Sequence, residues 1–182
     1  MNEELHFHFV CTRDEAHEIT DQHDKYWVSN CGCRESGPGC KRSRMDVCLF
    51  FDTQMGGTGS NFREVDREFV EGILKEAEEN HLVVRPFRYE DDKTSIQGIC
   101  FCCDDCCYYF TAESAAPCDK GTFIEETDMD ACTDCAACVE VCYFGARKMT
   151  DDNLEVIRNN CHGCGLCIDV CSAGCIRMVE RQ

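Results

Sequence analysis

Two stretches of the chain carry four cysteines each at the same spacing. The first runs from Cys132 to Cys142 and the second from Cys161 to Cys171, and both read C-x2-C-x2-C-x3-C. Three thiolates spaced in this way wrap a loop around one metal centre, and the fourth lies on a short helix that leads away from it. The repeat therefore predicts a small module that folds around two metal centres.

Cysteine is abundant throughout the chain, with 20 among 182 residues. Such a content is typical of a disulfide or metal scaffold. The N-terminal "MNEELHFHFV" has no basic segment followed by the apolar stretch of a signal peptide, and the longest apolar run, "VCLFF" at 47–51, is far too short to span a membrane. We therefore expect a cytoplasmic protein in a reducing setting, where dense cysteines indicate metal binding.

The net charge of the chain is −17. Nucleic acid and anionic membranes are poor partners for such a surface, because both repel acidic proteins. The charge favours a redox protein with a basic docking surface as the partner, and their association should weaken as salt rises.

The C-terminal region resembles the two-[4Fe-4S] ferredoxin domain of bacteria over residues 122–182, through "CTDCAACVEVCYFGA" and "CHGCGLCIDVCSAGCI". Zinc ribbons and disulfides remain the alternatives, although a single C-x2-C would suit them better than two identical runs do. The resemblance implies that three cysteines of each run hold one cluster and the fourth crosses to the other cluster. The implied ligands of cluster 1 are Cys132, Cys135, Cys138 and Cys171, and those of cluster 2 are Cys161, Cys164, Cys167 and Cys142.

The segments between these cysteines fit an α+β ferredoxin-like module at residues 119–182. Residues 121–126 alternate like a strand, residues 147–157 read as a hairpin, and residues 175–180 close the sheet. Cys175 falls where a small apolar residue would suit the fold, so we expect a buried free thiol there.

Residues 1–118 form a second, cysteine-rich α+β domain with its own groups of cysteines. Within the later group, Cys100, Cys103 and Cys106 have the C-x2-C-x2-C spacing of a cluster loop. Adjacent cysteines in an extended chain point to opposite sides, so the vicinal pairs suit two different clusters or one large cluster. The first group is Cys31, Cys33, Cys40 and Cys48, and the second is Cys100, Cys102, Cys103, Cys106 and Cys107.

This half resembles ferredoxin-like iron–sulfur proteins of anaerobes that place a C-x-C-R segment, a helix and an I-C-x-C-C-x2-C-C segment before a two-cluster domain. The matching pieces are "CGCRESGPGC", "MDVCLFF", "VDREFVEGILKEAEENHLV" and "ICFCCDDCC". The resemblance implies that the nine cysteines hold one or two further iron–sulfur clusters. A zinc site and a dithiol/disulfide switch at the vicinal pairs are the alternatives. Cys11 and Cys118 stand apart and have no predicted role.

The remaining N-terminal sequence predicts a scaffold. Two residue pairs have capping-box spacing, Thr12 with Glu15 and Asn61 with Glu64. We expect helices at 13–23 and 62–80, the second with an apolar stripe against the core. Residues 83–89 read as extended, and Pro86 favours an edge strand there.

The sequence shows no general base, nucleophile or substrate-pocket pattern beside its many sites for one-electron chemistry. We therefore expect an electron carrier that passes low-potential electrons to or from a redox partner, rather than an enzyme. The alternative is a small iron–sulfur reductase, in which an N-terminal cluster with an open site, or a larger cluster, acts on a small molecule or a disulfide. A third interpretation is a structural zinc module fused to a ferredoxin.

Overall fold

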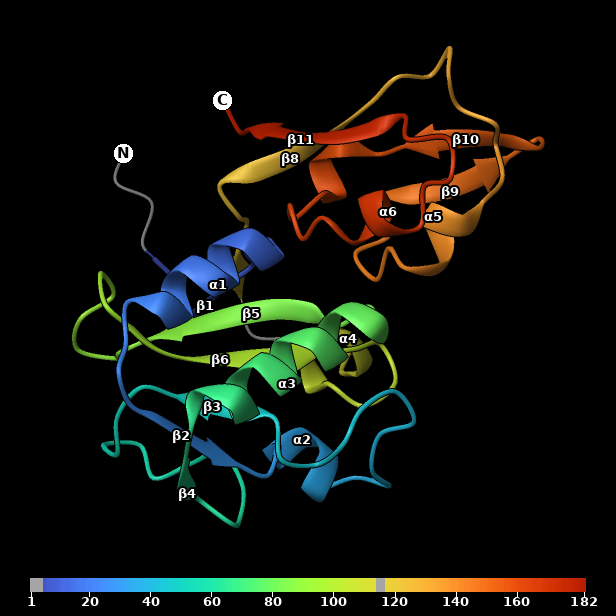
Figure 1. The fold of residues 1–182 in the computed structure, drawn as a ribbon. Coiled ribbons are helices and arrows are strands. Elements are labelled where there is room, and N and C mark those ends of the chain that lie inside the picture. Colours follow the sequence, from blue (N-terminus) through green and yellow to red (C-terminus); the bar gives the residue numbers. More distant parts are fainter. Residues whose placement is uncertain (1–4, 114–116) are drawn as a thin grey trace.

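The computed structural model describes residues 5–113 and 117–182, and it has two parts (Figure 1). The N-terminal part is a seven-stranded sheet with two helices on one face, and the C-terminal part is a smaller module with two two-stranded sheets. This mixed architecture confirms the expected α+β class. Within the described residues, no helix is long and apolar enough to cross a membrane.

The large sheet has the strand order β4-β2-β3-β6-β5-β1-β7, and every pairing is antiparallel except that of β1 with β7. The expected domain boundary between residues 118 and 119 falls inside β7, so the chain leaves the sheet just after that point. The strands are β1 (His8–Phe9), β2 (Tyr26–Ser29), β3 (Cys48–Phe50), β4 (Arg63–Val65), β5 (Val83–Arg88), β6 (Ile96–Cys102) and β7 (Cys118–Asp119).

Helix α1 (Arg13–Asp21) begins where the capping box predicts. The Thr12 backbone N–H donates to Glu15 Oε2 at 2.8 Å, and the Glu15 N–H donates back to Thr12 Oγ1 at 3.3 Å. Two backbone donors that the helix leaves free are satisfied in this way. The N-terminal part also contains the long helix α3 (Arg67–Glu79) and two short helices, α2 (Gly32–Glu35) and α4 (Tyr108–Thr111).

The helix predicted at 62–80 begins later than its sequence signal indicates. Residues 63–65 pair with β2 as strand β4, and the residue that caps α3 is Asp66, whose carboxylate accepts from the Phe69 N–H at 2.9 Å. Asn61 has φ +58 and lies in the turn before β4, so the prediction of a cap at Asn61 is wrong. Because residues 63–65 pair with β2, they cannot form the first helical turn that the capping-box spacing predicts, and the helix begins at Arg67 instead.

The apolar stripe of α3 packs as predicted. Its buried residues are Val70, Ile73, Leu74 and Ala77. They share one core with α1 and with the face of the sheet that both helices cover.

Strand β5 lies inside the sheet, between β6 and β1, so the prediction of an edge strand is wrong. The backbone groups of its even-numbered residues face β1: Arg88 N donates to Phe7 O at 2.9 Å, and Val84 O accepts from Cys11 N at 3.2 Å. Pro86, which has no N–H, turns the same way. Its missing donor costs little, because the β1 ladder is very short there.

The C-terminal module confirms the three predicted β segments. Strands β8 and β11 pair antiparallel, and β9 and β10 form the hairpin, with Asp151 (φ +49) and Asp152 (φ +63) in its two-residue turn. Its elements are β8 (Phe123–Thr127), α5 (Ala137–Glu140), β9 (Arg147–Thr150), β10 (Asn153–Val156), the 3-10 turn η1 (Arg158–Asn160), α6 (Leu166–Asp169) and β11 (Ile176–Glu180).

The backbone of this module repeats along with its cysteines. Residues with positive φ recur at matching places in the two runs, and the pairs are Asp134 with Gly163, Ala136 with Gly165, and Gly145 with Gly174. At Gly163 a Cβ would lie 2.1 Å from Phe123 O, so this position requires glycine. Two loops of the same shape therefore present the two cysteine runs.

The helix-facing core should dominate the stability of the N-terminal part. Ile73 is 1% exposed, so Ile73→Ala should lower the free energy of unfolding by about 2–5 kcal/mol, through lost burial and the cavity left behind. Anaerobic thermal or denaturant unfolding measures this, with Lys75→Ala, on the exposed face of α3, as the control. Equal effects of the two substitutions would contradict the described packing.

Candidate metal centres

All twenty cysteines are free thiols, and most of them gather in four groups. The first group, which we call site 1, lines a small cavity between the loop before α5 and the end of α6. It combines three cysteines of the first run with the last cysteine of the second run. Its members are Cys132, Cys135, Cys138 and Cys171.

Site 2 is the second cavity of the C-terminal module, and it has the reciprocal composition. Its cysteines are Cys142, Cys161, Cys164 and Cys167. The structure thus brings together the two crossed sets of four that the sequence predicts. Burial raises the pKa of Cys164 and of Cys167 to about 12, so these thiols keep their protons at neutral pH until a metal displaces them.

Backbone N–H groups point at the sulfurs in both sites. Asp134 N donates to Cys132 Sγ at 3.5 Å, and Ala146 N donates to Cys142 Sγ at 3.3 Å. The backbone N–H of Cys175 donates in the same way to Cys171. Such bonds favour the thiolate form and help to set the potential of an iron–sulfur cluster, so the donor set fits that cofactor.

A buried ion pair lies between the two sites. Arg147, at the start of β9, donates to Glu125 Oε2 at 2.7 Å and to Cys138 Sγ of site 1 at 3.5 Å. The side chains of Arg147 and Glu125 are 1% and 3% exposed. Burial lowers the pKa of Arg147, but the thiolates of Cys167 and Cys138, together with Glu125, raise it overall. One buried cation therefore acts on both sites.

Cys175 adds a fifth thiol to the lining of site 1. It is buried, as predicted, and its Sγ lies 3.5 Å from Cys171 Sγ. The matching place in the first repeat holds Ala146.

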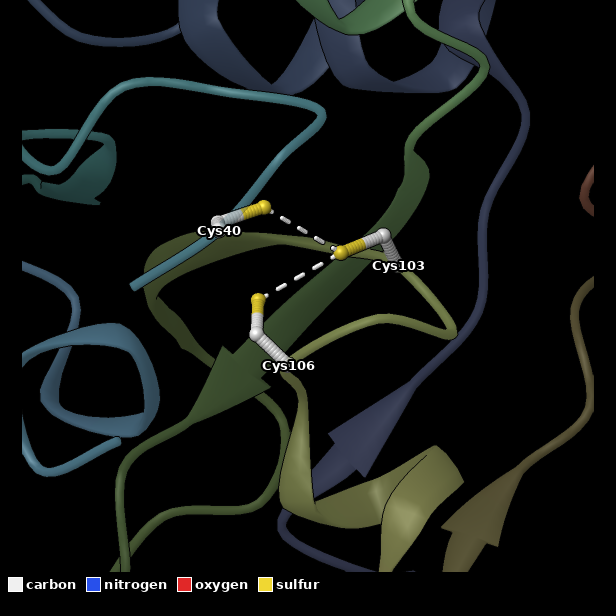
Figure 2. A group of neighbouring side chains, drawn as sticks. All are labelled: Cys40, Cys103 and Cys106. Atoms are coloured by element: carbon white, nitrogen blue, oxygen red, sulfur yellow. Dashed lines mark hydrogen bonds between the residues drawn. The ribbon is translucent and has the colours of Figure 1, made fainter. Parts of the chain in front are cut away.

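The N-terminal part contains a three-thiol group, formed by Cys40, Cys103 and Cys106 (Figure 2). Cys103 Sγ lies 3.5 Å from Cys40 Sγ and 3.4 Å from Cys106 Sγ, and all three sulfurs lie within 4.8 Å of one another. The structure thus differs from the sequence prediction, which grouped Cys100 with Cys103 and Cys106. Cys40, from the loop after α2, takes the place of Cys100.

The other six cysteines of the two N-terminal groups form a second set, which we call the six-thiol ring. Its members are Cys31, Cys33, Cys48, Cys100, Cys102 and Cys107. The Cys31 thiol contacts those of Cys33 and Cys48. Cys48 in turn contacts Cys100, and Cys107 contacts both Cys33 and Cys102. All nine predicted cysteines therefore belong to one of two groups.

Strand alternation explains this division. Phe101 and Cys103 join the core beneath α1 and α3, whereas Cys100 and Cys102 join the apolar clusters on the opposite face of the sheet. The turn after β6 then returns Cys106 to Cys103 and Cys107 to Cys102. Each vicinal pair thus sends one thiol to each group, as expected of adjacent cysteines in an extended chain.

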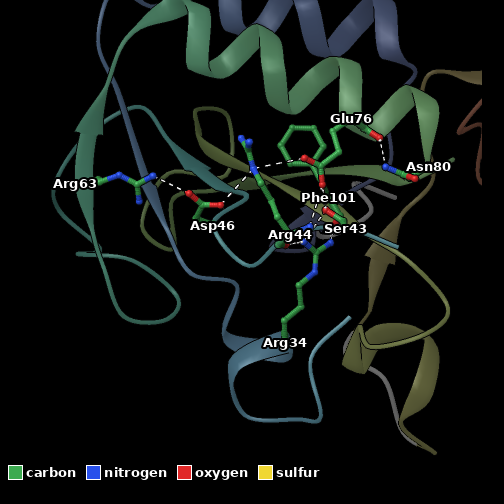
Figure 3. A network of polar contacts seen from close by, with 8 residues as sticks. All are labelled: Arg34, Ser43, Arg44, Asp46, Arg63, Glu76, Asn80 and Phe101. Atoms are coloured by element: carbon green, nitrogen blue, oxygen red, sulfur yellow. Dashed lines mark hydrogen bonds and ion pairs between the residues drawn. The ribbon is translucent and has the colours of Figure 1, made fainter. Parts of the chain in front are cut away.

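A buried arginine and a polar network hold the loop that carries Cys40 (Figure 3). Arg34 is 1% exposed, and it donates to Ser43 Oγ and to Phe101 O, each at 2.9 Å. Ser43 Oγ donates in turn to Glu76 of α3 at 2.6 Å. Burial lowers the pKa of Arg34, but the nearby thiolates of Cys31 and Cys40 raise it overall.

A second buried arginine stands beside the six-thiol ring. Arg85 of β5 is 4% exposed, and its Nη1 lies 3.8 Å from both Cys102 Sγ and Cys107 Sγ. Its guanidinium stacks over the Tyr109 ring, 3.9 Å from the ring centroid. Cys118 of β7 also interacts with Arg85. Among residues 5–113 and 117–182, neither Arg34 nor Arg85 forms an ion pair with a carboxylate.

The two parts of the molecule meet where the thiol groups are densest. One apolar cluster joins Val10 and Val83 of the sheet to Val141 and Leu166 of the C-terminal module. Cysteines from both parts border this cluster: Cys33, Cys100, Cys102, Cys107, Cys118 and, from site 2, Cys164. The six-thiol ring and site 2 therefore flank one continuous interface.

Sequence reasoning missed the three arginines that accompany the thiols. Each one had a signal in the sequence, namely a charged residue inside an otherwise apolar or cysteine-rich segment. Arg34 follows Cys33 directly, Arg85 interrupts "LVVRPF", and Arg147 follows "YFGA". A lone arginine in such a segment must find an anionic or hydrogen-bonding partner when it is buried.

Comparison with known families identifies part of this arrangement. Residues 125–148 match the family described as the 4Fe-4S binding domain. The match includes the first cysteine run, and the second run lies beyond it. Comparisons with curated proteins and with solved structures gave no match. The chain therefore contains one recognised 4Fe-4S binding domain at residues 125–148, together with a cysteine-rich N-terminal part that includes a three-thiol group suited to a metal.

Proposed function

We propose that this protein is an iron–sulfur electron carrier, in which two [4Fe-4S] clusters at sites 1 and 2 exchange low-potential electrons with a redox partner. The observation that carries the proposal is the pair of four-thiol cavities, each combining three cysteines of one run with one of the other. The N-terminal thiol groups extend the same system with one or two further iron–sulfur centres.

The residues present fit such clusters. Each cavity offers at least the four cysteine sulfurs that a [4Fe-4S] cluster needs, with Cys175 as a fifth at site 1, and backbone N–H groups turn toward the sulfurs. A cluster bound at either site supplies one-electron chemistry: the donor loses one electron and the acceptor gains it, with no bond made or broken. The chain itself contributes the thiolates, the N–H···S bonds and the buried cation Arg147.

The exposure of the two sites favours site 1 as the point where electrons enter or leave. Cys135 of site 1 is exposed, whereas site 2 borders the interface with the N-terminal part. Site 1 is therefore the natural point of contact with a partner. Exposed carboxylates lie in the same segments as its cysteines, at Asp128, Asp130 and Glu140, and they favour a partner with a basic docking surface.

The three-thiol group favours a second candidate function, that of a small reductase. It offers three sulfurs, one fewer than a closed four-coordinate site, and catalytic metal sites keep a position open. Reduction of a disulfide consumes two electrons and two protons and yields two thiols. Two successive one-electron deliveries from the C-terminal clusters, with protons from water, would satisfy this balance.

Metal analysis and ligand addition test both functions. Full-length protein made without oxygen should contain more than about eight irons with matching sulfide, since sites 1 and 2 account for about four irons each. Its visible absorbance should bleach on reduction. A carrier should show no spectral change with cyanide or carbon monoxide, whereas a change confined to N-terminal signals would favour the reductase. Protein that saturates with zinc and shows no iron–sulfur absorption would rule out both.

The crossed ligation of the two sites makes a sharper prediction. Cys142→Ala should damage the cluster at site 2, although Cys142 belongs to the first run, and Cys138→Ala should damage the cluster at site 1. Electron paramagnetic resonance of the reduced protein, with iron counts, distinguishes the two losses. Loss of the same cluster in both variants would show that each run holds a cluster alone.

The buried cation should set the potentials of both clusters. Arg147→Met removes a positive charge beside Cys138 and leaves Glu125 unpaired, so both reduction potentials should fall by tens of millivolts. Arg147→Lys should restore part of the shift because it keeps the charge. Anaerobic redox titration measures these potentials, and unchanged values in Arg147→Met would contradict the described position of the cation. The double variant with Glu125→Gln controls for the unpaired carboxylate.

A further inference from the structure

We propose that the six-thiol ring is a single polynuclear iron–sulfur site, distinct from the three-thiol group. The inference rests on the proposed iron–sulfur function, and it names which N-terminal cysteines share a centre.

The contacts among the six thiols form one continuous path. They run from Cys100 to Cys48, to Cys31, to Cys33, to Cys107 and to Cys102. The two ends of this path, Cys100 and Cys102, are alternate residues of β6, on one face of the strand and roughly 7 Å apart along it. The packing agrees with this path, because the six thiols border two apolar clusters that share Cys100 and therefore form one continuous group.

The sheet separates five of the ring thiols from the three-thiol group, and Cys31 borders the clusters on both faces. Cys102 and Cys103 are adjacent, yet Cys102 packs in the cluster that faces the C-terminal module, and Cys103 packs beneath α1 and α3. Cys106 and Cys107 divide in the same way. One centre could not bind both Cys102 and Cys103, because these two thiols lie on opposite faces of the sheet.

The charges around the ring require an anionic occupant. Arg85 is buried against Cys102 and Cys107 and, among the described residues, has no carboxylate partner. A buried guanidinium without an anionic partner is strongly destabilising, so a stable fold requires negative charge on the sulfurs. A metal–thiolate cluster supplies the required charge.

The number of thiols indicates the kind of cluster. A cubane uses four cysteine ligands, and six contiguous thiols exceed that number. The six-thiol ring therefore suits a cluster with more than four cysteine ligands, in which several irons are bridged by sulfide. Iron and sulfide are favoured over a zinc pair, because the ring flanks the same interface as Cys164 of site 2, where a redox-active centre continues the electron path.

The test compares Cys100→Ala, Cys102→Ala and the double variant in full-length protein assembled with ⁵⁷Fe and sulfide without oxygen. These residues are the two ends of the contact path. If they share one centre, both single variants should lose or convert the same Mössbauer component, and the double variant should lose no more iron than either single variant. Cys118→Ala is the matched control, because Cys118 interacts with Arg85 and borders the same apolar cluster but lies outside the contact path of the six thiols. It should keep that component.

Signals from sites 1 and 2 report folding in every variant. Two different components lost by the two single variants, with additive iron loss, would show two separate sites and overturn the proposal. A ring filled with zinc while sites 1 and 2 hold iron would also overturn it, and so would loss of the component in Cys118→Ala. Absence of iron from sites 1 and 2 in the unsubstituted protein would instead contradict the proposed function, so the two failures are distinguishable.

Discussion

The contact between a buried guanidinium and cysteine sulfur organises this molecule. All three buried arginines lie beside thiols: Arg34 beside both N-terminal groups, Arg85 beside the six-thiol ring, and Arg147 between sites 1 and 2. Of these three, and within the described residues, only Arg147 has a buried carboxylate beside it. Burying an unpaired charge costs more free energy than an ordinary buried side chain contributes. We therefore expect these arginines to be stable in the interior only when the neighbouring sulfurs are ionised, as they are when they bind a metal. Folding and metal binding should therefore be strongly coupled.

The fold places the N-terminal cysteines on both faces of the seven-stranded sheet. The helices α1 and α3 cover one face with aliphatic side chains, and the three-thiol group lies at the margin of that core. Among residues 5–113 and 117–182, no long helix covers the opposite face (Figure 1). Aromatic side chains, the six-thiol ring and the C-terminal module cover it instead, which places the N-terminal sulfurs next to site 2.

Local signals predicted much of the fold. The cysteine runs, the capping box at Thr12 and the hairpin around Asp151 each depend on a few consecutive residues, and the structure confirms these elements. The predictions at Asn61 and Pro86 were wrong because sheet pairing decided both places. The grouping of Cys40 with Cys103 was beyond sequence reasoning, because it depends on how the Arg34 network folds back a loop about sixty residues away. Spacing alone favoured Cys100, and strand alternation excluded it.

The parallel pairing of β1 with β7 has a consequence for motion. The strand nearest the N-terminus holds the last strand before the C-terminal module, through Val10 N and Asp119 O at 3.0 Å, and Arg88 adds an ion pair to Asp119 at 2.8 Å. Just beyond, Gly121 N donates to His162 O inside the second cysteine loop at 2.8 Å. Modules joined by a free linker would swing relative to each other. Here hydrogen bonds and an ion pair hold the connection at both ends, so we expect the distance between the two halves, and between any centres that they bind, to be set by the fold.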